Sequence, residues 1–368
     1  MLRSVQEINN QGGKSARLNL NGMLDNRDGK LQSNGEMQLD ARSLLNGTGS
    51  ISSQRQLGLR IQERLDNTGG TLRSNGDQRI SAGQVNNRQG LFNSLGTLDV
   101  TADQLDNPDG TFISRGNGIY RINVLNNQQG KIHGGGTLIF KGEAINNQAG
   151  QLIATGSMRI DSQTLNNHGQ GKMTSQNALV VHSDRVNNHD GGLLLGTTHT
   201  AVTTRELDNT AGRLQSTGTL TLSNLDKLVN RQGKIRANGA LDLNAGLPSV
   251  LALFNQGGLV QSGEQLTVNT RALDNTGGTL LSQQGLTLAV QQDYTHRTGD
   301  MISSNGTLTF SVGGTLTNLA DWLLPGRLIV NSTHFINQGT LAGKTLQLTT
   351  GRLRNENRLE ADSMTLTK

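Results

Sequence analysis

The chain of 368 residues contains 33% hydrophobic residues, 48 glycines, three prolines and no cysteine, and its formal net charge is +5. The lack of cysteine excludes a disulfide framework and a thiolate metal site. Because the charges are scattered and only 2% of the residues are aromatic, a nucleic-acid partner is not expected. The first residues form no apolar signal-peptide region and no run reaches 18 apolar residues, so no membrane span is expected.

One short pattern recurs along the chain: an aliphatic anchor residue, an asparagine two positions later, and a glycine three positions after that asparagine. The anchors are Ile8, Leu24, Leu44, Leu65, Val85, Leu105, Leu125, Ile145, Leu165, Val186, Leu207, Leu228, Leu253 and Leu273, with Thr295, Leu316, Phe335 and Leu353 as the best fits beyond them. From Leu65 to Leu165 the anchors are 20 residues apart. A fixed period of this length is the signature of a solenoid.

Between these turns, apolar and polar residues alternate, as in a strand with one face in a core and one in water. Leu72, Ser74 and Ile80 are expected to point inward, and Arg73 and Arg79 outward. A coil of this length is too short for a strand–helix–strand unit. The pattern predicts an all-β parallel β-helix of about 18 coils. Residues 1–290 are expected to form regular coils, and residues 291–368 more degenerate coils that continue the same shaft.

The repeated asparagine has two interpretations. Stacked coils lie about 4.8 Å apart, so inward residues such as Asn67, Asn87 and Asn107 can pass amide hydrogen bonds from coil to coil. The alternative is a plain turn former, a role that Asp or Ser would also fill. We prefer the ladder, and we expect the following glycine, for example Gly70, to adopt a positive φ.

The residue between the anchor and the asparagine is expected to face outward, as in Asp66, Asn86 and Asp106. No two aspartates occupy this position on adjacent coils. Because like charges at this spacing repel by about 1 kcal/mol even in water, the pattern resembles avoidance of charge stacking. Separated carboxylates also argue against a bound column of calcium ions.

Candidate catalytic and metal-binding residues are few. His168 and His189 each follow a repeated asparagine, but no third ligand accompanies them, so we interpret them as solvated turn residues rather than a metal pair. Polysaccharide-cleaving β-helices need clustered carboxylates, and no adjacent coils repeat a carboxylate pair here. We therefore predict no catalytic, cofactor-binding or metal-binding residues and no enzymatic activity.

Three segments depart from the pattern. The interval between Leu228 and Leu253 is 25 residues long, which predicts a loop over residues 244–252. The asparagine column is expected to break at Arg297, and residues 319–326, with the only tryptophan, are expected to interrupt the coil.

The phrase Leu-Asp-Asn-x-x-Gly-x-Leu-x-Ser-x-Gly-x-Leu-x-Leu-x-Ala-x-x-Leu-x-Asn, well preserved in residues 65–87, 105–127 and 207–230, resembles the haemagglutinin repeat of filamentous haemagglutinin-type exoproteins. These include two-partner-secreted adhesins and contact-dependent growth inhibition toxins. The resemblance covers residues 8–290. It implies a right-handed parallel β-helix, export through a dedicated outer-membrane two-partner secretion transporter, and display at the bacterial cell surface. The chain resembles an internal segment of such a protein or a truncated product.

These observations lead to one favoured function and two alternatives. The favoured function is a structural and adhesive shaft that projects a binding or toxin module and can contact target cells along its side. The first alternative is a direct receptor-binding segment, with the 244–252 loop and residues 319–326 as its contacts. A carbohydrate-active β-helix enzyme is the third class. The sequence does not identify a receptor or glycan.

Overall fold

A computed structural model describes residues 7–10, 15–244 and 250–368. Within them every regular element is a β-strand, and the strands stack in parallel as a β-solenoid of about 17 turns of roughly 20 residues each. The predicted all-β parallel β-helix is confirmed, with one turn fewer than expected. The chain divides into two compact units, Met1–Ser183 and Asp184–Lys368, called unit 1 and unit 2.

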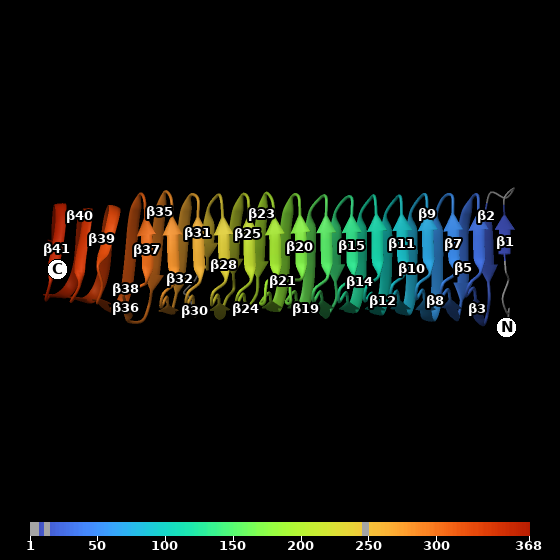
Figure 1. Cartoon of the computed structure of the whole chain (residues 1–368), viewed down its shortest axis with the longest axis horizontal. Coiled ribbons are helices and arrows are strands. Elements are labelled where there is room, and N and C mark those ends of the chain that lie inside the picture. Colours follow the sequence, from blue (N-terminus) through green and yellow to red (C-terminus); the bar gives the residue numbers. More distant parts are fainter. Residues whose placement is uncertain (1–6, 11–14, 245–249) are drawn as a thin grey trace. The chain divides into compact units, whose positions relative to one another are not determined.

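In each unit, one strand of four residues per coil forms a parallel sheet, called sheet 1 (Figure 1). In unit 1 its strands are β1 (Glu7–Asn10), β4 (Lys30–Ser33), β7 (Ser50–Ser53), β9 (Thr71–Ser74), β11 (Leu91–Ser94), β13 (Thr111–Ser114), β15 (Lys131–Gly134), β18 (Gln151–Ala154) and β20 (Lys172–Ser175). In unit 2 they are β22 (Leu193–Gly196), β25 (Arg213–Ser216), β28 (Lys234–Ala237), β31 (Leu259–Ser262), β34 (Thr279–Ser282) and β37 (Met301–Ser304).

The rest of each coil belongs to sheet 2, either as one longer strand or as two short ones. The strands that begin in unit 1 are β2 (Ser15–Asn19), β3 (Met23–Asp25), β5 (Glu36–Ala41), β6 (Ser43–Leu45), β8 (Leu57–Asp66), β10 (Gln78–Asn86), β12 (Leu98–Asp106), β14 (Gly118–Asn126), β16 (Leu138–Lys141), β17 (Ala144–Asn146), β19 (Met158–Asn166) and β21 (Ala178–Asn187). Those of unit 2 are β23 (His199–Thr203), β24 (Glu206–Asp208), β26 (Thr219–Ser223), β27 (Lys227–Val229), β29 (Leu241–Leu243), β30 (Ala252–Phe254), β32 (Gln265–Thr270), β33 (Ala272–Asp274), β35 (Gly285–Val290), β36 (Tyr294–His296), β38 (Thr307–Asn318), β39 (Trp322–Asn337), β40 (Thr340–Asn355) and β41 (Arg358–Thr367).

The core consists of columns of equivalent residues, because the strands pair in register. Phe92 of β11 pairs with Leu72 of β9 on one side and with Phe112 of β13 on the other. All three side chains are fully buried, and the two phenylalanine rings stack 4.3 Å apart. The expected sides of the strand are confirmed: Leu72, Ser74 and Ile80 are buried, and Arg73 and Arg79 are exposed. Each coil therefore adds a layer of the same core.

The coils after β37 differ from the earlier ones. The strands β39 and β40 are 16 residues long each, and β39 pairs with both β38 and β40. Trp322 and Leu324 lie within β39 and pair with Leu341 and Gly343 of β40, and the pairing shifts register between Leu324 and Arg327. The interruption predicted for residues 319–326 is therefore a local irregularity and not a break in the coil. The extended backbone continues because the alternation places Trp322 and Leu324 in the core.

The anchor expected at Thr295 lies one residue earlier. Tyr294 pairs with Leu316, and His296 pairs with Asn318, so His296 rather than Arg297 takes the asparagine position. Both Tyr294 and His296 are buried. The burial of a large Tyr ring against Phe310, at a centroid distance of 5.5 Å, explains the shift, because an anchor at Thr295 would turn this ring outward. The fits at Leu316, Phe335 and Leu353 agree with the pairing of β38, β39 and β40.

Candidate functional site

The asparagine turn is the most strongly built feature of each coil. In the coil of Asn87, the side-chain Nδ2 donates to Oδ1 of Asn107 at 2.8 Å and to the carbonyl oxygen of Gly90 at 3.1 Å. The backbone N–H of Gly90 donates back to the carbonyl oxygen of Asn87 at 3.0 Å. Asn87 is fully buried, so one amide satisfies its own turn and the next coil at once.

The same bond repeats from coil to coil within each unit. Donor–acceptor distances between successive amides are 2.6–2.8 Å, and the donor is always the Nδ2 of the earlier coil. The ladder comprises Asn26, Asn46, Asn67, Asn87, Asn107, Asn127, Asn147 and Asn167 in unit 1, and Asn188, Asn209, Asn230, Asn255 and Asn275, then Asn318, Asn337 and Asn355, in unit 2. The predicted ladder is confirmed.

The reason given for the repeated glycine is wrong at most turns. Positive φ occurs one residue earlier, at Gly69 and at non-glycine residues such as Gln89 (φ 54°) and Asp109 (φ 55°), although Gly191, three residues after Asn188, has a φ of 80°. The repeated glycine is needed for space: a Cβ on Gly110 would lie closer than 3.0 Å to the carbonyl oxygen of Asn87 and to the amide of Asn107. Close approach of the ladder, rather than backbone conformation, therefore selects glycine here.

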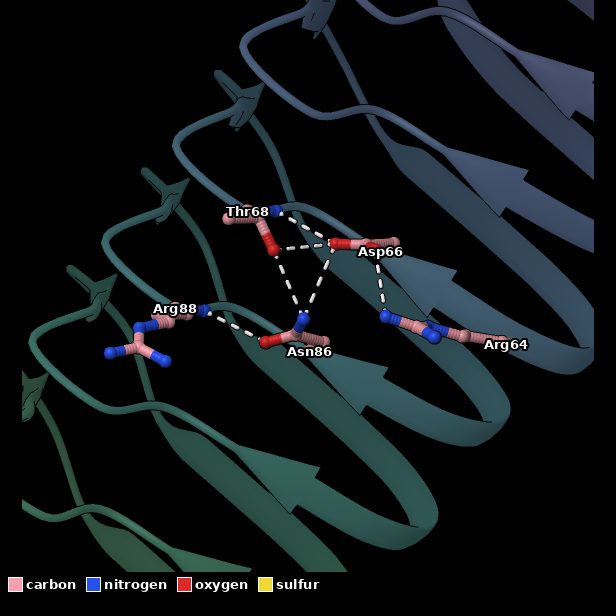
Figure 2. Close-up of polar contacts among 5 residues, drawn as sticks. All are labelled: Arg64, Asp66, Thr68, Asn86 and Arg88. Carbon is pink, nitrogen blue, oxygen red and sulfur yellow. Dashed lines mark hydrogen bonds and ion pairs between the residues drawn. The ribbon is translucent and has the colours of Figure 1, made fainter.

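The outward residue beside the anchor has a structural role that the sequence reasoning missed. The Oδ1 of Asp66 accepts hydrogen bonds from the backbone N–H of Thr68 at 3.1 Å and from its hydroxyl at 2.6 Å. Asn86 of the next coil donates to the hydroxyl of Thr68 at 3.0 Å, and its own Oδ1 accepts from the N–H of Arg88 (Figure 2). These side-chain-to-backbone bonds are Asx turns. The recurrence of Asp-Asn-Thr at residues 66–68, 208–210 and 274–276 was the available signal.

These turns shift the acidity of some carboxyl groups. A side-chain hydrogen bond from Arg27, reinforced by the N–H and the charge of the same residue, lowers the pKa of Asp25. Burial alone would raise the pKa of Asp274, but hydrogen bonds from Thr276 and Gln256 bring it below its ordinary value. Both carboxyl groups are therefore held as anions by turn contacts, which is a structural use rather than a catalytic one.

The two histidines considered as a metal pair lie in different units. His168 belongs to unit 1 and His189 to unit 2, and His189 Nδ1 lies 2.7 Å from a carboxylate oxygen of Asp190. No group of three or more His, Asp or Glu side chains suited to a metal ion occurs in the part of the chain that the structure describes.

The expected 244–252 loop is described only at its ends, because residues 245–249 lie outside the described residues. Asn244 is buried and its Nδ2 donates to the carbonyl oxygen of Leu225 at 2.9 Å. The stacking continues across the insertion, since Asn230 Nδ2 reaches Asn255 Oδ1 at 2.7 Å. Val250 is 58% exposed. The extra residues therefore leave the ladder intact.

Residues 319–326 combine a core tryptophan with exposed leucines. The Trp322 Nε1 donates to the carbonyl oxygen of Ile302 at 2.9 Å, and its ring stacks on His296 at 4.4 Å. Leu319 and Leu323 are 45% and 65% exposed. Trp322 therefore packs in the core, whereas Leu319 and Leu323 are accessible to solvent and could contact a receptor.

A hollow of about 680 Å³ lies on sheet 2 of unit 1, lined by Arg17, Arg60 and Arg79 among others. Of its three carboxylates, Asp77 accepts from the N–H of Thr97 at 2.8 Å and Asp99 pairs with Arg121 at 2.7 Å, while Glu36 is exposed on the lining. Asp77 and Asp99 therefore serve contacts between coils, and neither is a free carboxylate of the kind that acid–base chemistry on a sugar needs.

The repeated sequence that forms these coils matches a known family. The model of the haemagglutinin repeat matches residues 8–69, 58–119, 120–183, 162–232, 236–320 and 325–367. The chain belongs to the haemagglutinin repeat family. The resemblance found in the sequence phrase is therefore confirmed.

"Toxin CdiA" of Yersinia pestis is 29% identical over 99 residues, which are 27% of this chain. The matched segment spans 3% of the length of that relative. No solved structure matches the chain significantly. In the described residues there is no helix of the length and apolarity needed to span a bilayer.

Proposed function

We propose that this haemagglutinin-repeat chain is part of the structural and adhesive shaft of a secreted, surface-displayed bacterial exoprotein. The shaft would hold a binding or toxin module away from the cell, and export would use an outer-membrane two-partner secretion transporter. Family membership and the similarity to "Toxin CdiA" support this proposal. The observation that carries it is the ladder of buried amides, which repeats the same contact in coil after coil.

A shaft needs stiffness along its axis. In the regular coils, each coil is bonded to the next by parallel strand pairing in both sheets and by the amide ladder. Bending it would separate buried amides, and each such group left without a partner costs about 1–3 kcal/mol. Each added coil extends the stack by about 4.8 Å, so reach would be set by the number of repeats.

The proposal includes two finer points. The chain itself is not an enzyme, which is supported by the engagement of two of the three carboxylates in the sheet 2 hollow. Turnover of an anionic polysaccharide by the purified chain would contradict this. Residues 1–290 are the regular part of the shaft and residues 291–368 its degenerate continuation. This division is supported by His296 in place of asparagine and by the long strands β39 and β40.

The shaft can be tested by removing whole coils. Deleting residues 87–146 joins Asn86 to Asn147 and takes out three 20-residue periods. We expect a folded protein whose maximum dimension in small-angle X-ray scattering falls by about 14 Å, at 4.8 Å per coil. The matched control deletes residues 87–136, which puts the core columns out of register and should abolish folding. Equal folding of both variants would contradict the repeat-by-repeat shaft.

A second candidate function is direct receptor binding by residues 319–326, favoured by the exposure of Leu319 and Leu323. The fluorescently labelled chain would be titrated onto target cells, and the variant Leu319→Ser/Leu323→Ser compared with it. Saturable binding that the variant loses supports the receptor-binding function. Binding that the variant retains excludes this segment as the contact.

A further inference from the structure

Sheet 1 carries no carboxylate on its outward face in unit 2. The first and third residues of its six strands point outward: Leu193, Leu195, Arg213, Gln215, Lys234, Arg236, Leu259, Gln261, Thr279, Leu281, Met301 and Ser303. The stretch from 184 to 304 contains ten Asp and Glu residues, and all of them lie in sheet 2 or in connections between strands. The outward positions of β4 to β20 in unit 1 also contain no Asp or Glu.

Three cations are gathered on two adjacent strands of this face. Arg213 of β25 is the register partner of Lys234 of β28, and Arg236 follows two residues later on the same side of β28. All three side chains are exposed, and none forms an ion pair with any residue that the structure describes. Adjacent strands lie about 4.8 Å apart, so these like charges repel one another in the free protein.

Aliphatic side chains border the three cations. Leu193 and Leu195 lie on β22, before β25, and Leu259 lies on β31, after β28. These leucines are half-buried on an open sheet, and the outward positions include no aromatic residue on which a sugar ring could stack. The hollow of sheet 2 lies in the other sheet and the other unit. A face with cations and leucines, but without acids or aromatics, matches an extended surface rather than a single small ligand.

We propose that sheet 1 of unit 2 binds an anionic lipid bilayer. Arg213, Lys234 and Arg236 would contact headgroup phosphates, and the leucines on either side would reach the boundary between headgroups and acyl chains. The charge is complementary, because the face has three unpaired cations and no carboxylate to repel the lipid. This inference goes beyond the proposed shaft, and it holds for the isolated chain whether or not the chain is exported.

The test uses the full chain and vesicles of phosphatidylcholine containing about 30% phosphatidylglycerol, an anionic lipid. We expect co-sedimentation with these vesicles but not with pure phosphatidylcholine. The variant R213Q/K234Q/R236Q should bind about 100-fold more weakly, at roughly fivefold for each cation near the surface. The control R60Q/R79Q/R88Q removes the same charge from exposed arginines of unit 1 that lie outside sheet 1, and it should bind like the unchanged chain. Circular dichroism checks that each variant is folded.

A second pair of measurements separates a bilayer from a soluble polyanion. Leu193→Ser/Leu195→Ser keeps every charge, and it should weaken binding to the vesicles several-fold. Binding to dextran sulfate at equal charge should be weak and unaffected by the leucine substitutions. The proposal is overturned if the control triple variant loses as much affinity as the sheet 1 variant, or if dextran sulfate binds as tightly as the vesicles.

Discussion

The steric role of the repeated glycine can be tested at Gly110. In Gly110→Ala the new Cβ would lie closer than 3.0 Å to the carbonyl oxygen of Asn87, and the same Cβ would crowd the Asn107 amide. Overpacking of this kind costs about 1–3 kcal/mol. It also strains the ladder bonds of 2.8 Å and 2.7 Å on either side of Asn107, at about 1 kcal/mol each. We expect the free energy of unfolding to fall by about 3–5 kcal/mol.

The matched control is Gly47→Ala. A Cβ at Gly47 meets nothing nearer than Arg27 Cγ at 3.6 Å and the carbonyl oxygen of Thr68 at 3.7 Å, and this glycine has no positive φ. Here the loss of freedom in the unfolded chain should dominate and stabilise the protein by up to about 1 kcal/mol. Both variants are compared by urea unfolding followed by circular dichroism.

A third variant separates space from backbone conformation. Asp109 has a φ of 55°, so Asp109→Gly should relieve strain and leave stability unchanged or slightly higher. The steric explanation is refuted if Gly110→Ala unfolds at the same urea concentration as the unchanged chain. It is also refuted if the two glycine-to-alanine variants lose equal stability.

Three further predictions concern the core, the ladder and one buried base. Leu98→Lys buries an unpaired charge, and this variant should aggregate on gel filtration. Asp99→Lys changes an exposed ion pair and should lower the free energy of unfolding by no more than about 1 kcal/mol. Equal behaviour of the two variants would contradict the assignment of Leu98 to the inward face and Asp99 to the outward face. Asn127→Leu should lower stability by about 2–4 kcal/mol in urea unfolding, because it leaves buried amides unpaired, while Asn126→Leu on the outer surface should cost less than half as much. Burial lowers the pKa of His296 from 6.5 to about 4. Between these two pH values His296 is protonated in the unfolded state but stays neutral in the folded state. The free energy of unfolding should therefore fall by about 3 kcal/mol as the pH drops from 6.5 to 4. His296→Asn should remove that dependence in melting curves.

Most of the coil could be predicted from the sequence because its determinants are local and repeated. The alternation around Leu72 and Ile80 specifies which residues face the core, and the spacing of Asn67 and Asn87 specifies the stacking. Positions where one large side chain decides the register could not be predicted. At Tyr294 the choice between two adjacent anchors depends on a buried contact with Phe310, which no local pattern contains.

The surfaces were harder to predict than the core. In linear order the charges look mixed, because acidic residues of sheet 2 and its connections alternate with the basic residues of sheet 1. Only the strand register brings Arg213 beside Lys234 and places the carboxylates away from both residues.

The role of Asp66 was missed for a related reason. Its Asx bond runs to a residue two positions away, whereas the repeat relates residues 20 positions apart, as in Asn67 and Asn87.

The amide ladder has a direction as well as a length. Wherever two ladder asparagines are bonded, the Nδ2 of the earlier coil donates toward the later one, as from Asn87 to Asn107 and from Asn107 to Asn127. The side-chain dipoles therefore align head to tail, and each bond polarises the next. Within an unbroken run of the ladder, a completed coil presents an amide hydrogen to the coil that forms after it, so a stack that grows from its N-terminal side offers a donor to the incoming asparagine. The two ends of the ladder are thus chemically different. The buried amides have the same N-to-C direction as the backbone.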